Sequence, residues 1–190
     1  YGIAVAGTHG KTTTTSMIAI ALERAGLDPT AVIGGRVSTF GSNARLGSGD
    51  LMVVEADESD GSFLRLAPAI AVITNLAREH LDHYGSFDRL EAAFVEFANK
   101  VPFYGATVAC LDDPALAKIV PAMTRRVVTY ALDATMAHVR GADVVLTAHG
   151  SRCDVRQRSG DGPDALLGPL RLSVPGRHNL LNAMAAVAVG

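Results

Sequence analysis

The sequence has no tryptophan, only two cysteines, and no apolar run that approaches the roughly 20 residues of a membrane-spanning helix. No basic segment followed by an apolar stretch and a cleavage site opens the chain, so we expect no secretory leader. Cys110 and Cys153 lack the spacing of metal ligands, which favours two reduced thiols over a disulfide or a catalytic nucleophile. These absences predict a cytoplasmic protein that does not bind membranes.

Charges of the two signs are nearly balanced, and the basic residues form no stripe. Seventeen Lys and Arg stand against 19 Asp and Glu, which gives a formal net charge of -2, and only 5% of the residues are aromatic. Nucleic-acid binding normally needs clustered basic residues, so we expect no nucleic-acid partner. The 190 residues, 48% of them hydrophobic, are enough for one sizeable domain, alone or with a small appendage.

A polar stretch with two glycines separates the first two structured segments. Residues 2–6 predict a strand, and residues 16–24 are compatible with a helix. Gly7 and Gly10 can adopt backbone angles that other residues avoid, which lets successive N–H groups face an anion. The following helix adds unpaired N–H groups and the positive end of its dipole. The stretch is therefore predicted to bind phosphate.

Lys11 and Thr12 fit the chemistry of a phosphate loop. The lysine would reach the β- and γ-phosphates of a nucleotide, and the threonine hydroxyl would ligate Mg²⁺. Val5 stands where the pattern G-x-x-x-x-G-K-[ST] has its first glycine, so we interpret the motif as a shorter variant, G-T-x-G-K-T. The alternative is a glycine-bearing turn with a solvated lysine. The order of strand, glycines, Lys-Thr and helix favours the phosphate loop.

A second candidate site follows the apolar run 51–55, which ends in Glu55. This run is typical of a buried parallel strand, which would deliver the carboxylate to the C-terminal edge of the sheet, where phosphate-loop enzymes hold Mg²⁺. Asp57, Glu58 and Asp60 follow, and their mutual repulsion needs a cation or hydrogen-bond donors to offset it. A solvated acidic loop is the alternative, but it does not explain why the cluster begins where a buried strand ends.

A third candidate lies beyond the next predicted strand, residues 69–74. His80 and Asp82 follow this strand, again toward the predicted active edge. A neutral imidazole at His80 is a candidate ligand for a second Mg²⁺ or a hydrogen-bond donor to phosphate, although hard cations prefer oxygen. A structural role is the alternative for a single histidine, and we assign that role to His83.

The middle of the chain predicts alternating helices and strands. Apolar residues at helical spacing predict a helix over Arg89–Asn99, capped by Ser86 or Asp88, and Asp113 with a proline opens a second. The second helix covers 114–123, further strands fall at 30–33, 107–111 and 127–130, and a loop or weak hairpin falls at 36–50. The series predicts an α/β fold with a mostly parallel sheet flanked by helices, similar to phosphate-loop NTPases.

The predicted order of elements changes at residue 137, where helices no longer alternate with strands. Short strands are predicted at 144–148, 154–158 and 170–174, with no helix between them, so they should pair antiparallel as a small satellite sheet spanning about 137–175. His138 and His149 are predicted to lie on its surface.

A polar cluster opens the last predicted helix, residues 183–189. Asn179 and Asn182 are three apart and so share one helix face. An amide side chain can both donate and accept hydrogen bonds, which suits the edge of an adenine. Helix capping is the alternative for one asparagine, but it does not readily account for both together with His178.

Four ordered motifs together resemble the Mur ligases and, within that family, the alanine-adding branch. The motifs are G-T-H-G-K-T-T-T at 7–14, E-A-D-E-S-D-G-S-F-L at 55–64, H-L-D-H-Y-G at 80–85 and G-R-H-N-L-L-N-A at 176–183. The resemblance covers nearly the whole chain. It implies that residues 1–190 are the central ATP-binding domain, without the N-terminal domain that holds the UDP-sugar and the C-terminal domain that brings the amino acid.

The resemblance also implies residue roles and a reaction. Lys11, Glu55 and His80 would be catalytic, and Thr12, Glu55 and His80 would hold Mg²⁺. The implied nucleotide-binding residues are Gly7, Thr8, His9, Gly10, Lys11, Thr12, Thr13, His178, Asn179 and Asn182. The implied reaction joins L-alanine to UDP-N-acetylmuramate through an acyl phosphate at the expense of ATP, in peptidoglycan precursor synthesis. Several sibling ligases carry a carbamylated lysine where this chain has residues 94–96, Phe-Val-Glu, which fits the alanine-adding branch.

Three other functions stay open. A sibling ligase, such as the enzyme that attaches a tripeptide to UDP-muramate or a folylpolyglutamate synthase, would use a similar domain. A phosphate-loop kinase or nucleotide switch is the second alternative, although the sequence shows no guanine-reading motif. The third is a non-catalytic nucleotide-binding module, and we expect residues 1–190 in isolation to bind ATP weakly without turnover.

Overall fold

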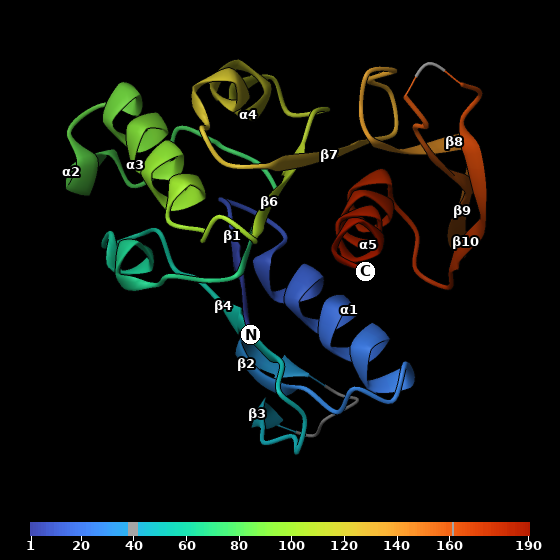
Figure 1. The fold of residues 1–190 in the computed structure, drawn as a ribbon, viewed down its shortest axis with the longest axis horizontal. Coiled ribbons are helices and arrows are strands. Elements are labelled where there is room, and N and C mark those ends of the chain that lie inside the picture. Colours follow the sequence, from blue (N-terminus) through green and yellow to red (C-terminus); the bar gives the residue numbers. More distant parts are fainter. Residues whose placement is uncertain (38–41, 161) are drawn as a thin grey trace.

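The strands form one continuous, mostly parallel sheet. The computed structural model describes residues 1–37, 42–160 and 162–190. In this part of the chain ten strands pair in the order β10-β9-β8-β7-β6-β5-β1-β4-β2-β3 (Figure 1). At the centre, parallel strands flank β1 (Gly2–Ala6) on both sides, namely β4 (Met52–Glu55) and β5 (Ile70–Ile73). The expected mostly parallel α/β architecture is confirmed.

The remaining parallel strands extend this centre in both directions. Next to β5 lie β6 (Ala106–Cys110) and then β7 (Val127–Ala131). On the other side, β2 (Thr30–Val37) pairs parallel with β4 and antiparallel with β3 (Ser42–Arg45). The predicted strands fall on these elements because strands buried on both faces need continuous apolar runs. The hairpin agrees with the expectation for 36–50, of which 38–41 lie outside the described residues.

Helices cover both faces of the sheet (Figure 1). One face carries α1 (Lys11–Arg24) packed beside α5 (Arg177–Val189). The other carries α3 (Phe87–Asn99) and α4 (Pro114–Ile119), which continues as the 3₁₀ turn η2 (Val120–Ala122). Two short turns, η1 (Ser62–Arg65) and α2 (Leu81–Tyr84), lie in the loops that follow β4 and β5. No helix in the described part is long and apolar enough to cross a membrane.

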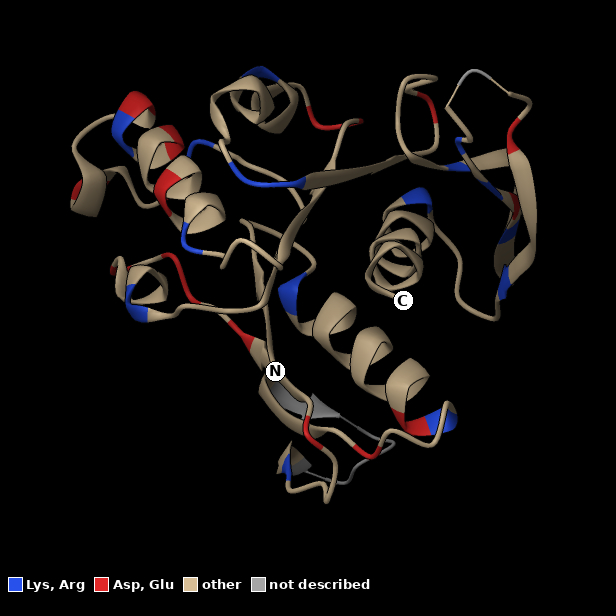
Figure 2. Cartoon of the chain, in the orientation of Figure 1, with Lys and Arg blue, Asp and Glu red and all other residues tan. Residues whose placement is uncertain are grey.

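Charged residues are distributed over several elements. Figure 2 shows Lys and Arg on helices and on the C-terminal strands, with Asp and Glu interspersed. The basic first turn of α1 lies beside the acidic segment that follows β4, where Lys11 contacts Glu58. Opposite charges therefore meet at the carboxyl edge of the parallel strands.

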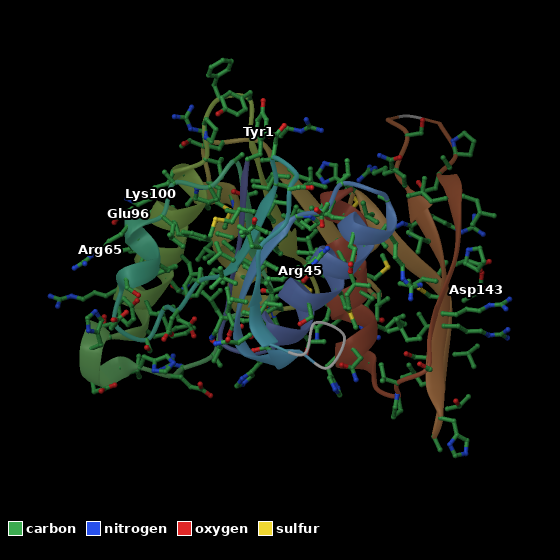
Figure 3. The ribbon with its side chains drawn as sticks, turned by 90° about the horizontal axis from the view of Figure 1, so that it is seen from below. Tyr1, Arg45, Arg65, Glu96, Lys100 and Asp143 are labelled. Atoms are coloured by element: carbon green, nitrogen blue, oxygen red, sulfur yellow. The ribbon has the colours of Figure 1, made fainter. Side chains whose placement is uncertain are left out.

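The start of helix α3 and its buried face both follow from its local sequence. The Ser86 side chain accepts a hydrogen bond from Arg89 N and caps the helix, whereas Asp88 lies inside the first turn. On the outer side, Glu96 and Lys100 form an ion pair at 3.2 Å (Figure 3). The apolar residues predicted at helical spacing are buried in the core: Leu90, Ala93, Phe94 and Phe97.

Three helices begin earlier than predicted: α3 begins at Phe87 rather than Arg89, and the differences are larger for α1 and α5. α1 begins at Lys11 rather than Ser16, and α5 begins at Arg177 rather than Ala183. Threonines fill the first turns of α1, and their branched side chains lower helix propensity. Inside the helix the Thr15 hydroxyl donates to the carbonyl oxygen of Lys11 at 2.8 Å, so its polar group is satisfied.

The expected satellite sheet is antiparallel but not separate. Val139 and Arg140 pair in parallel with the last residues of β7, so the three C-terminal strands continue the main sheet. The first of these strands therefore begins at Val139 rather than Val144. The three are β8 (Val139–Thr147), β9 (Gly150–Gln157) and β10 (Ala165–Leu172), paired antiparallel in chain order. His138 and His149 are exposed, as predicted.

Candidate active site

The loop between β1 and α1 has the backbone of a phosphate-binding loop. Gly7 and Gly10 have positive φ angles of 131° and 83°, a conformation that side chains disfavour. A Cβ at Gly7 would lie 2.2 Å from Thr74 Oγ1, and one at Gly10 would lie 2.5 Å from Asn182 Oδ1. Both positions therefore require glycine for two reasons, and the expectation about their backbone angles is confirmed.

Residues that follow β5 hold this loop in place, although no motif in the sequence marks them. The Thr74 hydroxyl donates to His9 O at 2.7 Å. The Asn75 side chain accepts from His9 N and donates to His9 O, both at 2.8 Å. The Thr8 hydroxyl accepts from Ala77 N at 2.8 Å. Because β5 is the parallel neighbour of β1, residues directly after it must lie beside the loop, which is the signal that could have found Asn75.

The first turn of α1 leaves backbone donors for an anion. The first hydrogen bond into the helix runs from Thr14 N to Gly10 O at 2.9 Å, so the preceding amides have no helical carbonyl to bond. These amides and the positive end of the helix dipole face the same side. A cavity of about 380 Å³ lies there, lined by Thr8, His9, Gly10, Lys11, Thr12, Thr13 and Glu55.

Lys11 reaches from α1 to a buried carboxylate. Its Nζ donates to Gly7 O at 2.9 Å and to Glu58 Oε1 at 3.0 Å, and lies 2.9 Å from Glu58 Oε2. The Glu58 side chain is only 1% exposed, and its Oε1 lies 3.6 Å from His80 Nε2. Glu58 therefore connects two of the predicted site residues, although the sequence analysis named it only as one member of an acidic cluster.

Tyr84 fixes the backbone beside this carboxylate. Its hydroxyl donates to Glu58 O at 2.5 Å. Burial, and next the negative charge of Glu58, raise the pKa of the Tyr84 hydroxyl to about 12. The hydroxyl therefore remains a hydrogen-bond donor throughout the neutral pH range.

Thr12 and Glu55 meet between α1 and the end of β4. The Thr12 hydroxyl donates to Glu55 Oε1 at 3.1 Å, and Gly34 N donates to Glu55 Oε2 at 2.8 Å. The acid lies at the carboxyl end of β4 because parallel strands end at a common edge. Its placement agrees with the sequence prediction.

A second cavity of about 570 Å³ adjoins the first and shares Lys11 and Glu55 with it. His80 enters this cavity from the start of α2, where its φ angle is 57°. The lining residues are Lys11, Val32, Ile33, Gly34, Glu55, Asp57, Ser59 and His80. Lys11, Thr12, Glu55 and His80, which are far apart in the sequence, thus lie around one edge of the sheet.

The donor atoms at this edge fit a Mg²⁺ ion that also binds a nucleotide. Mg²⁺ keeps several waters and is usually bound through one or two carboxylates together with substrate phosphates. Thr12 Oγ1 and Glu55 Oε1, 3.1 Å apart, are a donor pair of this kind. Among the described residues no three His, Cys, Asp or Glu side chains form a metal-binding group. Such a cation would therefore need phosphate and water as its other ligands.

The polar residues at the start of α5 divide between the loop and the helix itself. Asn182 is 7% exposed and lies against Gly10 of the loop. The Asn179 amide donates to Pro175 O at 2.7 Å, a local contact at the helix start. His178 packs back against the same helix start. The structure thus brings Asn182 to the phosphate loop and directs the Asn179 amide elsewhere, while the adenine-facing role of these residues stays a prediction.

Arg177 anchors α5 to the edge of the sheet. Its Nη2 donates to Asp112 Oδ2 at 2.8 Å and to Asp133 Oδ2 at 2.7 Å. Asp112 follows β6 and also accepts hydrogen bonds from the backbone N–H groups of Leu132, Asp133 and Ala134. This contact joins the ends of β6 and β7 to the helix that carries Asn182, a role that the sequence does not reveal.

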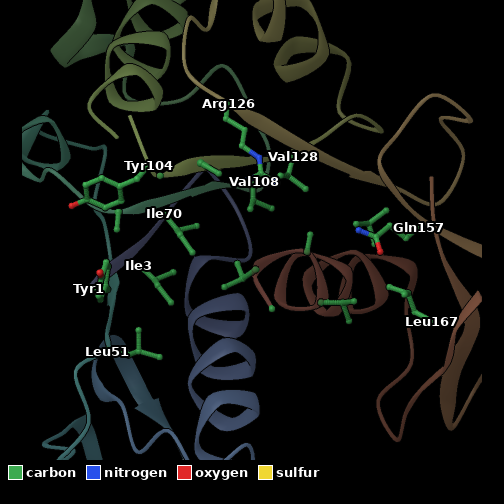
Figure 4. Close-up of a pocket in the computed structure, with 18 residues that line it drawn as sticks. Tyr1, Ile3, Leu51, Ile70, Tyr104, Val108, Arg126, Val128, Gln157 and Leu167 are labelled. Carbon is green, nitrogen blue, oxygen red and sulfur yellow. The ribbon is translucent and has the colours of Figure 1, made fainter. Parts of the chain in front are cut away.

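Another cavity, of about 640 Å³, lies away from this edge (Figure 4). It is bordered by Ile3, Ile70 and Val108 at the beginning of the parallel strands and by the last turn of α5. Its lining is largely apolar and contains no Asp, Glu or Lys. The cavity therefore lacks the paired acid and lysine found at the carboxyl edge.

Cys110 and Cys153 take no part in either region. Both thiols are buried and free. Burial raises the pKa of each to about 11. A thiol with such a pKa is a poor nucleophile at neutral pH, and the expectation of two reduced thiols is confirmed.

A strand, a glycine loop, a lysine-bearing helix and a carboxylate at the end of the neighbouring strand define a phosphate-loop nucleotide-binding domain. Residues 5–190 match the family described as Mur ligase middle domain. The chain therefore belongs to the Mur ligase family, as its four motifs indicated.

Individual relatives agree with this family. The UDP-N-acetylmuramate--L-alanine ligase of Solibacter usitatus is 58% identical over 190 residues, which are 100% of this chain and 39% of that protein. MurC, the UDP-N-acetylmuramate-alanine ligase of Thermotoga maritima, has a solved structure with a TM-score of 0.81 and 30% identity, covering 99% of this chain and 40% of that chain. The chain thus spans about two fifths of the length of the curated relatives it matches.

Two further structures come from other branches. The UDP-N-acetylmuramate:L-alanyl-gamma-D-glutamyl-meso-diaminopimelate ligase of Neisseria meningitides also has a TM-score of 0.81 and 30% identity, covering 99% of this chain and 60% of that chain. MurF ligase of Thermotoga maritima, solved in complex with ADP, has a TM-score of 0.72 and 20% identity, covering 99% of this chain and 44% of that chain. The similarity of this structure to the present chain shows that the two share a fold.

Proposed function

We propose that the intact protein is an ATP-dependent ligase that joins L-alanine to the carboxyl group of UDP-N-acetylmuramate, a step in peptidoglycan precursor synthesis. The 58% identical relative from Solibacter usitatus, which is named for that activity, supports the choice of substrates. The convergence of Lys11, Thr12, Glu55 and His80 at one edge of the sheet carries the choice of reaction class. Residues 1–190 would be the central domain, with the UDP-sugar and the amino acid held largely by other parts of the protein.

In this proposal ATP lies with its triphosphate against the first turn of α1. The loop amides donate to phosphate oxygens, and Lys11 contacts the β- and γ-phosphates. Thr12 and Glu55 would hold one Mg²⁺, and His80 would face a second. When bound, Mg²⁺ neutralises charge on the phosphate oxygens. The other residues proposed to contact nucleotide are Gly7, Thr8, His9, Gly10, Thr13, His178, Asn179 and Asn182.

The proposed reaction has two steps. A carboxylate oxygen of the muramate attacks the γ-phosphorus of ATP in line, and the bond between this phosphorus and the β–γ bridging oxygen breaks, releasing ADP. The amine of L-alanine then attacks the carbonyl carbon of the acyl phosphate. The carbon–oxygen bond to phosphate breaks, the nitrogen loses a proton, and the products are the amide and inorganic phosphate.

Electrostatic stabilisation is the main task of this chain in the first step. Two anions, a carboxylate and a triphosphate, must approach each other, so charge has to be offset where it develops. Lys11 and His80 both line the 570 Å³ cavity, and the loop amides line the adjoining 380 Å³ cavity, which shares Lys11 with it. We propose that the muramate carboxylate approaches the γ-phosphate through this cavity.

The test is an assay of the intact protein with ATP, Mg²⁺, UDP-N-acetylmuramate and L-alanine. We expect ADP, inorganic phosphate and UDP-N-acetylmuramoyl-L-alanine in equal amounts, detected by coupled ADP release and mass spectrometry. Release of ADP with a stable phosphorylated product and no amide would instead indicate a kinase. Nucleotide binding without turnover of any acceptor would indicate a binding module.

A second assay separates the sibling ligases. The Neisseria meningitides neighbour is as similar in structure as MurC is, so the fold does not choose between a single amino acid and a peptide. We expect turnover with L-alanine to exceed turnover with the L-alanyl-γ-D-glutamyl-meso-diaminopimelate tripeptide. Preference for the tripeptide would assign the protein to the other branch.

A further inference from the structure

Glu58 is a buried acid to which the proposed reaction gives no task. Its side chain is 1% exposed, and both carboxylate oxygens lie within 3.0 Å of Lys11 Nζ. Lys11 also donates to Gly7 O at 2.9 Å. The positive charge that should attract phosphate is therefore already paired in the free protein.

The charges around the phosphate-binding loop do not favour binding of a triphosphate without its cation. Lys11 carries one positive charge, whereas Glu58 and Glu55 carry one negative charge each, and all three lie at the same edge. Such charges interact strongly where solvent is partly excluded. A polyphosphate entering without a cation would meet an excess of negative charge from the protein.

The three acids at this edge differ in how freely solvent can screen them. Asp57 is exposed. Glu55 is partly buried and lies next to Thr12, so a cation bound there would offset it directly. Glu58 is shielded from solvent and is not next to Thr12, where that cation would bind. Tyr84 also fixes the backbone of Glu58. Its carboxylate is thus held beside Lys11 and His80 in the free protein.

We propose that Glu58 is a specificity-determining residue that makes the site select the divalent-cation complex of a nucleoside triphosphate over the metal-free nucleotide. The proposal rests on the proposed function, in which a nucleoside triphosphate binds at the phosphate-binding loop. By pairing with Lys11, Glu58 removes the attraction that would otherwise hold a bare polyphosphate. A cation that accompanies the nucleotide supplies the missing positive charge, so the complex binds more tightly than the free nucleotide.

Isothermal titration calorimetry on the intact protein tests this without turnover. ATP is titrated once with excess Mg²⁺ and once with EDTA, for wild type and for Glu58→Gln. We expect the variant to bind metal-free ATP about tenfold more tightly, because Lys11 loses its partner, and Mg²⁺-ATP within about threefold of wild type. The ratio of the two dissociation constants should therefore fall about tenfold.

Three further variants make the result specific. Glu96→Gln removes the same charge from an exposed ion pair on α3 and should leave the ratio at its wild-type value (Figure 3). Glu58→Asp keeps the negative charge and should keep most of the discrimination. Glu58→Asn is a second neutral variant, to be used where the Gln variant does not fold as judged by circular dichroism.

The possible results separate the two proposals. If wild type binds ATP neither with Mg²⁺ nor with EDTA, the proposed function fails. If wild type binds Mg²⁺-ATP but the neutral variants leave the ratio unchanged, or weaken both forms of the nucleotide equally, the role given to Glu58 is wrong. A ratio that falls equally in the aspartate variant would also overturn it, because the charge would not be the cause.

Discussion

At the scale of single residues, the pair formed by Lys11 and Glu58 is the contact most sensitive to change. The carboxylate is buried, so removing the lysine leaves a negative charge that water cannot solvate. We predict that Lys11→Ala lowers the free energy of unfolding by about 3 kcal/mol, in addition to abolishing ligation. Urea denaturation measures the first effect and ADP release the second.

A double variant identifies the cause of this loss. In Lys11→Ala/Glu58→Gln the unpaired charge is gone, so at least half of the lost stability should return. The matched control is the pair of exposed Glu96 and half-buried Lys100, where Lys100→Ala should cost only about 0.5 kcal/mol or less. A double variant as unstable as Lys11→Ala alone would mean that the buried charge is not what destabilises the protein.

The two cysteines give a second residue-scale prediction. Burial raises the thiol pKa of Cys110 and of Cys153 to about 11, so the fraction of reactive thiolate is small at pH 7 and increases as the pH approaches 11. Native protein should react slowly with Ellman's reagent at pH 7, whereas protein in guanidinium should react with two equivalents at once. Rapid labelling of the native protein at pH 7 would contradict the buried placement.

A functional residue can be predicted from the sequence when a local motif marks it. It cannot be predicted in this way when its role depends on which distant residue it contacts in the fold. Lys11, Thr12 and Glu55 could be predicted because glycine spacing and a strand end mark them. Glu58 could not, because nothing in an acidic loop says which carboxylate folds inward. Asn75 was missed because its role is to hold backbone atoms of a loop 66 residues away in the sequence.

At the scale of elements, the turn that opens α1 depends on glycine at position 10. Gly10 and Gly26 both have positive φ, but a Cβ at Gly10 would lie 2.5 Å from Asn182 Oδ1, whereas one at Gly26 would meet nothing within 4 Å. Gly26→Ala should therefore cost only backbone strain, about 1 kcal/mol. Gly10→Ala should cost about 3 kcal/mol, because overpacking adds to the strain.

Thermal or urea unfolding of the two alanine variants is the measurement, with ATP affinity as a second readout. Gly10→Ala should also weaken nucleotide binding, since the loop amides move, while Gly26→Ala should bind as wild type does. Equal effects of the two substitutions on stability and on binding would show that the contact between the loop and α5 is unimportant.

The anchoring of α5 gives the second element-scale prediction. Asp112 accepts from Arg177 and from three backbone N–H groups and is 6% exposed, whereas Asp133 is 77% exposed. We predict that Asp112→Asn lowers stability by about 2 kcal/mol, because several charge-assisted hydrogen bonds weaken together, and that Asp133→Asn costs about 0.5 kcal/mol or less. Similar losses for both, measured by urea denaturation, would contradict the anchor.

Element types could be predicted from the sequence, but several boundaries could not. The threonines at the start of α1 and the His-Asn pair at the start of α5 have low helix propensity, so pattern alone places both helix starts too late. Tertiary packing of α1 against α5 supplies the missing stability. β8 begins as early as Val139 because its first residues pair with β7, and local periodicity does not predict this pairing.

At the scale of the whole molecule, topology creates the site. The strands β1, β4 and β5 are parallel neighbours, so the segments that follow them meet at one edge although Gly7 and His80 lie 73 residues apart in the chain. This convergence could be predicted from strand order alone. The continuation of the sheet through β8, β9 and β10 could not, because a meander of short strands is equally compatible with a separate sheet.

The central claim is that a nucleoside triphosphate and its cation sit at this edge, between the first turn of α1 and Glu55. The most direct measurement is a crystal structure of the intact protein with a non-hydrolysable ATP analogue and Mn²⁺, using anomalous scattering to locate the metal. We expect phosphates against the loop amides and Lys11, and a Mn²⁺ peak beside Thr12 and Glu55. A nucleotide in the apolar cavity at the opposite end of the strands, or a metal away from Glu55, would contradict it.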